Sequence, residues 1–338
     1  MSLAEQQTGT DVADIPVIDL SSLGTSGPAS DTIVTAIGEA CRRIGFFVVT
    51  GHGVPAATLA AAAELTRAFF ALPAADKLAL SIERSPHNRG YVRLQSETLN
   101  LARPADEKEA FNIGLDLGPD DPEVITGKRF RGVNVWPELP GWRAGMLDYF
   151  DRATALGLAL LGAFARDLGE PADRFLPWME RPSATLRLLR YPPQPPVAVA
   201  GRPGAAERIG AGEHTDYGAL TLLTQLDGGG LEVRRRDGAW VPVPVIPGSF
   251  VYNLGECLMR ASNDVYVATP HRVISTSPAQ RHSIAFFFDP SPDAIIAPLA
   301  SCVAADRPAR YPAVLFTDYL ASRLDPTYGV THGATQGD

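Results

Sequence analysis

After residue 180, the chain consists mainly of short apolar runs separated by proline and glycine. Such runs, rich in β-branched and aromatic residues and bounded by turn residues, are typical of the strands of an all-β sandwich or barrel. We therefore predict a β core in this part of the chain, with the Pro/Gly-rich residues 192–210 as a loop between two strands. The seven predicted strands are ATLRLLRY, ALTLLTQL, GLEVRR, AWVPV, SFVYNL, HRVIST and RHSIAFFF.

The first half of the chain has the patterns of helices as well as strands. From Trp142 to Leu168, apolar side chains recur at spacings of three and four, which predicts one long helix with a single buried stripe. The other expected elements are strands over 15–20 and 45–54 and helices over 30–45, 55–70 and 311–324.

The chain's 338 residues are enough for one large domain with a sizeable core. We predict one integrated domain, in which a helical and mixed N-terminal region packs against the β core. Its predicted parts are a disordered tail at 1–14, the N-terminal region at 15–180, the β core at 181–300, and a C-terminal helix and tail at 301–338.

Charge and cysteine content indicate which partners and compartments suit the chain. Thirty basic and 38 acidic side chains give a net charge of −8, which argues against a nucleic-acid or anionic-membrane partner. No segment approaches the ~20 apolar residues of a membrane span, and residues 1–14 lack the basic and apolar regions of a secretory signal. Cys41, Cys257 and Cys302 are few and widely spaced, as expected for reduced thiols. The expected location is the cytoplasm, and nothing indicates the oligomeric state.

Residues 212–218, GEHTDYG, place a histidine and an aspartate one position apart. If a strand begins here, His214 and Asp216 project from the same face, because side chains i and i+2 of a strand point the same way. A polar turn explains the same pair equally simply. His271, at the start of HRVIST, offers a third ligand. Two histidines and one carboxylate with open positions opposite form the facial arrangement of non-haem Fe(II) oxygenases.

The run RHSIAFFF places an arginine and a serine on one face of a strand. Arg281 and Ser283 share that face, while His282 points the other way. Residues 275–280 are expected to form a hairpin turn, which would place Arg281 on the strand next to His271. A guanidinium with a hydroxyl beside it suits a carboxylate ligand. An internal ion pair with an acidic residue of the protein is the other explanation.

Taken together, His214-Thr-Asp216, His271 and Arg281-His-Ser283 resemble the iron and 2-oxoglutarate signature of the isopenicillin-N-synthase-like oxygenase superfamily. The resemblance covers nearly the whole chain and implies a double-stranded β-helix, or jelly roll, with an N-terminal helical region packed against it and a C-terminal helix. The segments that resemble family landmarks, in the family's order, are IPVIDL, FFVVTGHGV, RGYVRLQSETLN, KEAFNIG, LRLLRYPP, VYNLGE and ATPHRVIS.

The resemblance also implies a reaction and roles for individual residues. The chain would use Fe(II), 2-oxoglutarate and O2 to oxidise an unactivated C–H of a small molecule, most simply by hydroxylation, with succinate and CO2 as coproducts. Members of this superfamily act on nucleobases, amino acids, peptides or secondary metabolites. The implied metal ligands are His214, Asp216 and His271; the implied 2-oxoglutarate residues are Arg281, Ser283 and Tyr191.

The substrate pocket would be lined by the N-terminal region and by the end of the last core strand. Four residues are the candidates, and core packing explains each of them at least as well. They are Asn112, Phe111, Tyr91 and Phe288. Asn112 is the best polar candidate, and Asn253 is a candidate support for the metal ligands.

Three alternatives remain open at this point. Leu189-Arg190-Tyr191-Pro192 stands where many plant members have Asn-Tyr-Tyr-Pro, and it is closer to isopenicillin N synthase, an Fe(II) oxidase that uses no 2-oxoglutarate. A jelly-roll protein that binds metal without catalysis is the second alternative. The third is a zinc hydrolase, which would have no need of Arg281 and Ser283 and for which the sequence offers no evident general base.

Overall fold

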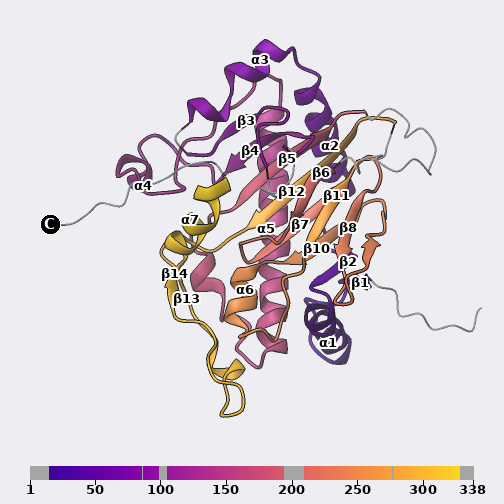
Figure 1. Cartoon of the computed structure of the whole chain (residues 1–338), viewed down its shortest axis with the longest axis vertical. Helices are drawn as coiled ribbons and strands as arrows, with labels where there is room; N and C mark the ends of the chain where they lie inside the picture. The colour runs from indigo at the N-terminus through magenta and orange to yellow at the C-terminus, as the bar shows by residue number, and fades with distance from the viewer. Residues whose placement is uncertain (1–14, 86, 99–104, 194–208, 276–277, 328–338) are drawn as a thin grey trace, which may run out of the picture.

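The computed structural model describes residues 15–85, 87–98, 105–193, 209–275 and 278–327 (Figure 1). The predicted tail at 1–14 and most of the predicted loop at 192–210 lie outside these residues. Within the described residues, the strands form two main sheets and one small pair.

The larger sheet has eight strands in the order β1-β2-β10-β7-β12-β5-β4-β3. Its N-terminal strands are β1 (Val17–Asp19), β2 (Phe46–Thr50), β3 (Gly90–Val92) and β4 (Glu109–Gly114). Its later strands are β5 (Thr185–Tyr191), β7 (Leu220–Gln225), β10 (Phe250–Leu254) and β12 (Arg281–Phe288). The first 180 residues therefore supply both ends of a sheet whose middle comes from the predicted β core.

The smaller sheet has the order β6-β11-β8-β9 and packs against the larger sheet. Its strands are β6 (Ile209–His214), β8 (Leu231–Arg234), β9 (Trp240–Pro242) and β11 (His271–Ile274). A separate pair joins β13 (Ile295–Ile296) and β14 (Val314–Leu315). Two facing sheets of this kind form a jelly roll, so the predicted fold class is confirmed.

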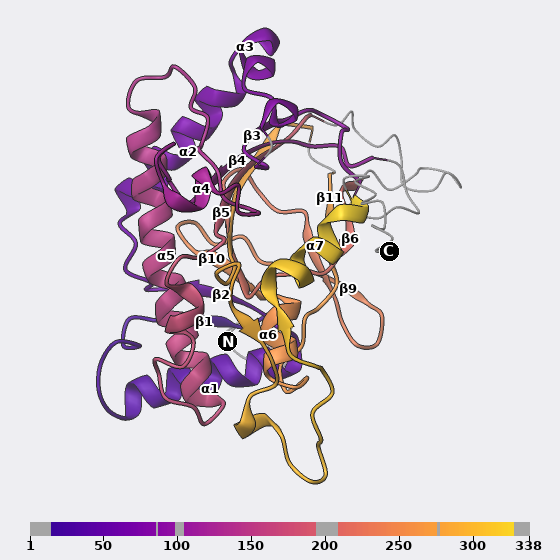
Figure 2. The same ribbon diagram turned by 90° about the vertical axis from the view of Figure 1, so that its left-hand side faces the viewer.

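The three longest helices, all from the first 180 residues, cover the outer face of the larger sheet, and its inner face lies opposite the smaller sheet (Figure 2). The helix α5 is the long predicted helix, and its buried side chains include the expected stripe from Trp142 to Phe164. The helices are α1 (Pro28–Arg43), α2 (Ala56–Phe70), α3 (Ala74–Ala79), α4 (Pro122–Ile125), α5 (Trp142–Asp167), α6 (Glu256–Ala261) and α7 (Phe316–Thr327). None of the described helices is long and apolar enough to cross a membrane.

Alternation along each strand of the larger sheet separates two environments. On β12, the side chains of His282, Ile284 and Phe286 are buried, and the latter two belong to the apolar core beneath the helices. Arg281, Ser283 and the odd-numbered positions after them face the smaller sheet. The larger sheet thus has one face in the core beneath the helices and one face opposite the smaller sheet, where apolar and polar side chains are mixed.

Two details of the local predictions are wrong. β11 pairs with β6 and β8, whereas β12 pairs with β5 and β7, so Arg281 does not lie on a strand next to His271. His214 is the last residue of β6, and Asp216 lies in the connection to β7, so the two do not share one strand. The division of the chain at residue 180 stays a prediction.

Candidate metal centre and its cavity

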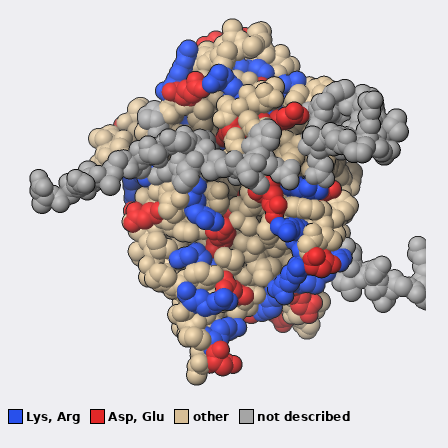
Figure 3. Space-filling model, viewed as in Figure 1, with Lys and Arg blue, Asp and Glu red and all other residues tan. Residues whose placement is uncertain are grey.

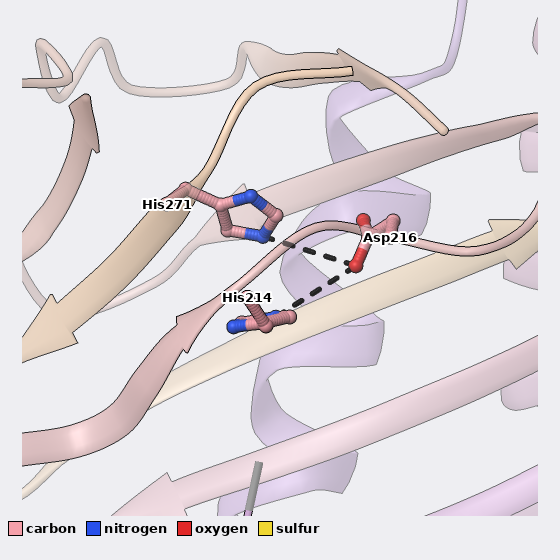
Figure 4. Close-up of side chains that lie close together, drawn as sticks. All are labelled: His214, Asp216 and His271. Atoms are coloured by element: carbon pink, nitrogen blue, oxygen red, sulfur yellow. Dashed lines mark ion pairs between the residues drawn. The ribbon is translucent and has the colours of Figure 1, made fainter. Parts of the chain in front are cut away.

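Three side chains from two segments of the chain converge between the sheets (Figure 4). His214 ends β6, His271 begins β11, and Asp216 follows β6 by two residues. The Nε2 atoms of His214 and His271 lie 3.7 Å and 3.8 Å from Oδ1 of Asp216. One ligand atom from each residue lies within 4.8 Å of the others, so a single ion can reach all three.

The backbone fixes the orientation of both imidazoles. His214 and His271 are register partners on adjacent strands, with ring centroids 4.3 Å apart. Nδ1 of His214 lies 2.7 Å from the carbonyl oxygen of Gly212, and Nδ1 of His271 lies 3.2 Å from that of Thr269. An N–H at each Nδ1 that donates to its carbonyl leaves the lone pair of Nε2 free for a metal.

Asp216 is held by two donors on the larger sheet. Its Oδ2 accepts hydrogen bonds from Thr221 Oγ1 on β7 at 2.5 Å and from Asn253 Nδ2 on β10 at 2.6 Å. Burial alone would raise the pKa of Asp216, but the nearby His271 and His214 and these two hydrogen bonds bring it below its usual value. Oδ1 of the carboxylate therefore remains available, and charged, on the side of the imidazoles.

The protonation of His214 also suits a metal ligand. Burial and the neighbouring His271 imidazole lower the pKa of His214 well below its usual value, so the ring is neutral at physiological pH. Two imidazoles and one carboxylate on one side of an ion match the facial set of Fe(II) oxygenases, which leaves further positions open. This donor set fits iron by its own chemistry.

Asn253 offers a test of how strongly the carboxylate depends on its support. We expect Asn253→Ala to weaken iron binding about 10- to 100-fold, because the hydrogen bond that orients Asp216 is lost. Calorimetric titration with Fe(II) under anaerobic conditions measures the affinity. Asn134 is a matched buried asparagine whose amide bonds the backbone of Gly114 instead. Equal losses of affinity in Asn253→Ala and Asn134→Ala would contradict the role of Asn253.

A cavity of about 220 Å³ opens beside the three residues, between the two sheets. Its floor is the face of the larger sheet that lies opposite the smaller sheet, and its opposite wall carries His214 and His271. Leu320 and Leu324 of α7 also line it. The metal group therefore lies on the wall of a cavity that can hold small molecules.

Arg281 lies in this cavity with part of its guanidinium unpaired. The residue is 4% exposed, and burial lowers the pKa of its guanidinium. Its Nε donates to the carbonyl oxygen of Gly228 at 3.3 Å. In the part of the chain that the structure describes, Nη1 and Nη2 have no hydrogen-bond partner. A buried cation with two donors that lack a partner among these residues is suited to a bidentate anionic ligand. The other explanation, an internal ion pair of Arg281, is not seen among the described residues.

The other two predicted cosubstrate residues are neighbours of Arg281. The guanidinium carbon lies 4.8 Å from the ring centroid of Tyr191, which is its register partner on β5. Ser283 lies two residues further along β12 and lines the same cavity. The structure therefore brings together all six residues predicted to bind metal and cosubstrate.

Of the four predicted substrate residues, only Asn112 is among those that line the cavity. Tyr91, Phe111 and Phe288 lie in the hydrophobic core on the other side of the sheet. Phe111 packs against Phe69 and Trp142. Alternation explains the difference, because Phe287 shares the cavity face with Arg281 and Ser283, whereas Phe288 does not.

Several polar residues that line the cavity were not predicted as site residues from the sequence. Arg89, Ser183 and Asp289 all line it and are far apart in the chain. Burial and the nearby Asp216 raise the pKa of Asp289 to about 7. Arg89 begins the landmark segment RGYVRLQSETLN, but its sequence context does not show that it lines the cavity, and Ser183 and Asp289 lie outside the landmark segments.

Comparison with known proteins places the site in context. Residues 15–139 match the family described as non-haem dioxygenase in morphine synthesis N-terminal, and residues 182–290 match the 2OG-Fe(II) oxygenase superfamily. A 2-oxoglutarate-Fe(II) type oxidoreductase, hxnY, of Emericella nidulans is 34% identical over 322 residues, which cover 93% of this chain and 90% of the relative. Homoarginine-6-hydroxylase 2-ODD-C23.1 of Arabidopsis thaliana is 36% identical over 304 residues, which cover 87% and 90%.

Solved structures agree over the same length. A 2OG-Fe(II) oxygenase family protein from Caulobacter crescentus has a TM-score of 0.79 at 32% identity, covering 92% of this chain and 98% of that one. A full-length Neurospora crassa protein, solved in complex with alpha-KG and thymine, has a TM-score of 0.78 at 29% identity, covering 93% and 97%.

Proposed function

This chain belongs to the 2OG-Fe(II) oxygenase superfamily, and we propose that His214, Asp216 and His271 hold its iron while Arg281 anchors its cosubstrate. The chain is an oxidoreductase that uses Fe(II), 2-oxoglutarate and O2. Its relatives are named for 2-oxoglutarate, which favours this class over an oxidase without that cosubstrate, a zinc hydrolase or a non-catalytic metal protein.

We assign these residues because one cavity contains both a group of possible metal ligands and an arginine that lacks an anionic partner among the described residues. A three-ligand group with open positions and an arginine with two unpaired donors line the same space. When bound there, iron and 2-oxoglutarate supply an oxidative decarboxylation to succinate and CO2, coupled to oxidation of a substrate C–H. The role of Arg281 is to hold the far carboxylate of 2-oxoglutarate, with Ser283 as a further donor and Tyr191 packed on the guanidinium.

The proposed outcome is hydroxylation of an unactivated C–H of a small molecule. The names of the relatives support an oxidised small molecule in general, because one is a homoarginine-6-hydroxylase and one solved complex contains thymine. The cavity between the sheets suits a ligand of that size. Desaturation, ring closure and demethylation are other outcomes of the same chemistry.

Release of succinate tests the proposal. We expect the purified protein to form succinate from 2-oxoglutarate slowly when Fe(II), ascorbate and O2 are present, and faster when the right small molecule is added. Mass spectrometry of the added compound then distinguishes the gain of one oxygen atom from the loss of two hydrogen atoms. Absence of succinate with every candidate substrate would overturn the use of 2-oxoglutarate and favour the oxidase.

We also propose that the protein works in the cytoplasm, without a nucleic-acid or membrane partner. Cys41, Cys257 and Cys302 are buried and form no disulfide with one another, and burial raises the pKa of each thiol. Lys and Arg side chains lie among Asp and Glu side chains over the face drawn in Figure 3. A mixed surface with a net charge of −8 supports this proposal.

A further inference from the structure

The cavity has a second polar end, away from the metal and the arginine anchor. It lies on β4, which is three strands away in the larger sheet from β7, one of the two strands that support Asp216. Asn112 and Gly114 are on the same face of β4, and the guanidinium of Arg89 lies directly over Gly114. A Cβ added to Gly114 would come within 2.2 Å of Arg89 Nε, so the glycine makes room for the arginine beside Asn112.

Both polar atoms of the Asn112 side chain are unpaired. The residue is 1% exposed, and neither Oδ1 nor Nδ2 has a hydrogen-bond partner among the described residues. A buried amide left in this state bears the desolvation penalty of each unsatisfied group. Because the side chain lines the cavity, a bound molecule with one donor and one acceptor on the same edge would satisfy it.

Arg89 adds a donor to this end. It is 4% exposed, and its Nη atoms donate to the carbonyl oxygens of His87 at 3.0 Å and Phe130 at 3.2 Å. Its Nε is buried and has no partner in the described chain. The hydroxyl of Ser183, which also lines the cavity, is likewise unpaired there. This end therefore offers at least two free donors beside the one donor–acceptor pair of Asn112.

The charged side chains near Asn112 are already paired, so they do not require an ionic ligand. Arg187 forms an ion pair with Glu97, and Lys108 lies 2.5 Å from Asp106 and 3.8 Å from Glu97. The Arg89 guanidinium is already bonded to backbone carbonyls, whose negative ends offset part of its charge. Polar atoms at this end of the cavity lack hydrogen-bond partners in the described chain, and a neutral polar ligand can supply them.

Register gives the position of this end relative to the metal. Gly114, Thr185, Phe287 and Thr221 form one row across β4, β5, β12 and β7, and Thr221 bonds Asp216. Three strand spacings separate β4 from β7, which is about 14 Å. A small molecule held at Asn112 can thus extend along the sheet toward the metal, while Arg281 lies at another edge of the cavity.

We infer that Asn112 and Arg89 form the substrate-recognition end of the cavity and select a small molecule with an amide or lactam edge. The inference rests on the proposed function. The substrate N–H donates to Oδ1 of Asn112, its carbonyl accepts from Nδ2, and a second acceptor faces Nε of Arg89. A purely hydrocarbon substrate would leave all of these buried groups unsatisfied.

Binding of matched ring compounds tests the inference. The protein is loaded with Fe(II) and 2-oxoglutarate under anaerobic conditions and titrated calorimetrically with 2-piperidone and with δ-valerolactone, which keeps the ring and carbonyl but lacks the N–H. Thymine and 1,3-dimethylthymine form a second pair. We expect the compound with N–H to bind about tenfold or more tightly than its partner in each pair, because the partner leaves Oδ1 of Asn112 unpaired. Equal binding within the pairs, or binding of neither pair, overturns the inference.

Variants connect the preference to this residue. Asn112→Leu is expected to bring the affinity ratio within each pair close to one, whereas Ile113→Leu, on the core face of the same strand, keeps it. A preference that survives in Asn112→Leu overturns the assignment, and the wild-type titration decides the ligand class even if that variant does not fold. Binding is measured without turnover, so loss of the preference is distinguishable from failure to form succinate, which would contradict the proposed function instead.

Discussion

Replacing Asp216 by alanine is expected to reduce succinate formation to the level of a sample without iron. Asp216 is the one anionic residue of the three-ligand group, and its Oδ1 lies within 4 Å of both imidazole Nε2 atoms. Loss of a supporting hydrogen bond at such sites costs about 10- to 100-fold in metal affinity, and loss of the ligand itself costs more. Calorimetric titration with Fe(II) and assay of succinate at saturating 2-oxoglutarate measure both effects.

A neighbouring carboxylate provides the control. Glu213 precedes His214 on β6, is ion-paired with Arg234 at 2.7 Å and does not line the cavity. Glu213→Ala removes the same charge next to the site and is expected to keep wild-type iron affinity and turnover. Asp216→Asn keeps the size of the side chain and its acceptor for Thr221 and Asn253, yet should also lose iron. Succinate formation by Asp216→Ala at the wild-type rate would disprove the metal assignment.

The second large effect is expected at Arg281. Arg281→Leu should raise the apparent KM for 2-oxoglutarate by about 100-fold or more and leave the affinity for Fe(II) nearly unchanged. Breaking a buried, hydrogen-bonded charge pair typically costs about 2–5 kcal/mol, and each 1.4 kcal/mol is tenfold in affinity. Arg281→Lys keeps the charge but not the paired donors, so it should recover only part of the loss. Initial rates of succinate formation across 2-oxoglutarate concentrations give the result.

Arg272 is the matched control for this experiment. It lies on β11 beside His271, but its Nε donates to Glu232 at 2.9 Å and its guanidinium stacks over Trp240, and it does not line the cavity. Arg272→Leu should therefore keep the KM for 2-oxoglutarate. Similar KM values in Arg281→Leu and the wild type would show that the unpaired Nη atoms serve some other ligand.

Most of the fold follows from local pattern. The stripe from Trp142 to Phe164 identifies α5, and the seven predicted strands appear as β5 and β7 to β12. β6 was missed because IGAGEH contains two glycines and follows a Pro/Gly-rich segment, so it lacks the composition of a strand. Its place is determined by pairing with β11, which is a contact between segments far apart in the chain.

The candidate site was predictable where residues share a motif or a family landmark. The metal group and Arg281 belong to such segments, and the structure brings them into one cavity. The predicted hairpin between β11 and β12 is wrong because the two strands belong to different sheets of the jelly roll. A short sequence between two strands does not show whether they pair with each other or lie in separate sheets. Phe288 does not line the cavity for a different reason. Strict alternation from Arg281 along the strand selects Phe287 instead.

Arg89 shows why the other polar residues of the cavity could not be predicted from the sequence. Its position depends on the glycine at 114, on the carbonyl oxygens of His87 and Phe130, and on the pairing of β3 with β4. No short stretch of sequence contains these facts together. The proposed substrate-recognition residues are brought together only by tertiary contacts, whereas the proposed iron ligands belong to recognisable sequence segments.

The larger sheet has a consequence for any attempt to recombine this enzyme with its relatives. β10 pairs with β2, and β5 pairs with β4, so strands from the first 180 residues flank the four strands of this sheet that come from the second half of the chain. A fragment of the second half alone would have two long edges with unpaired N–H and C=O groups, which are templates for aggregation. Exchange of whole N-terminal halves between relatives would thus succeed only where both strand registers match, at Phe46–Val49 and at Glu109–Gly114.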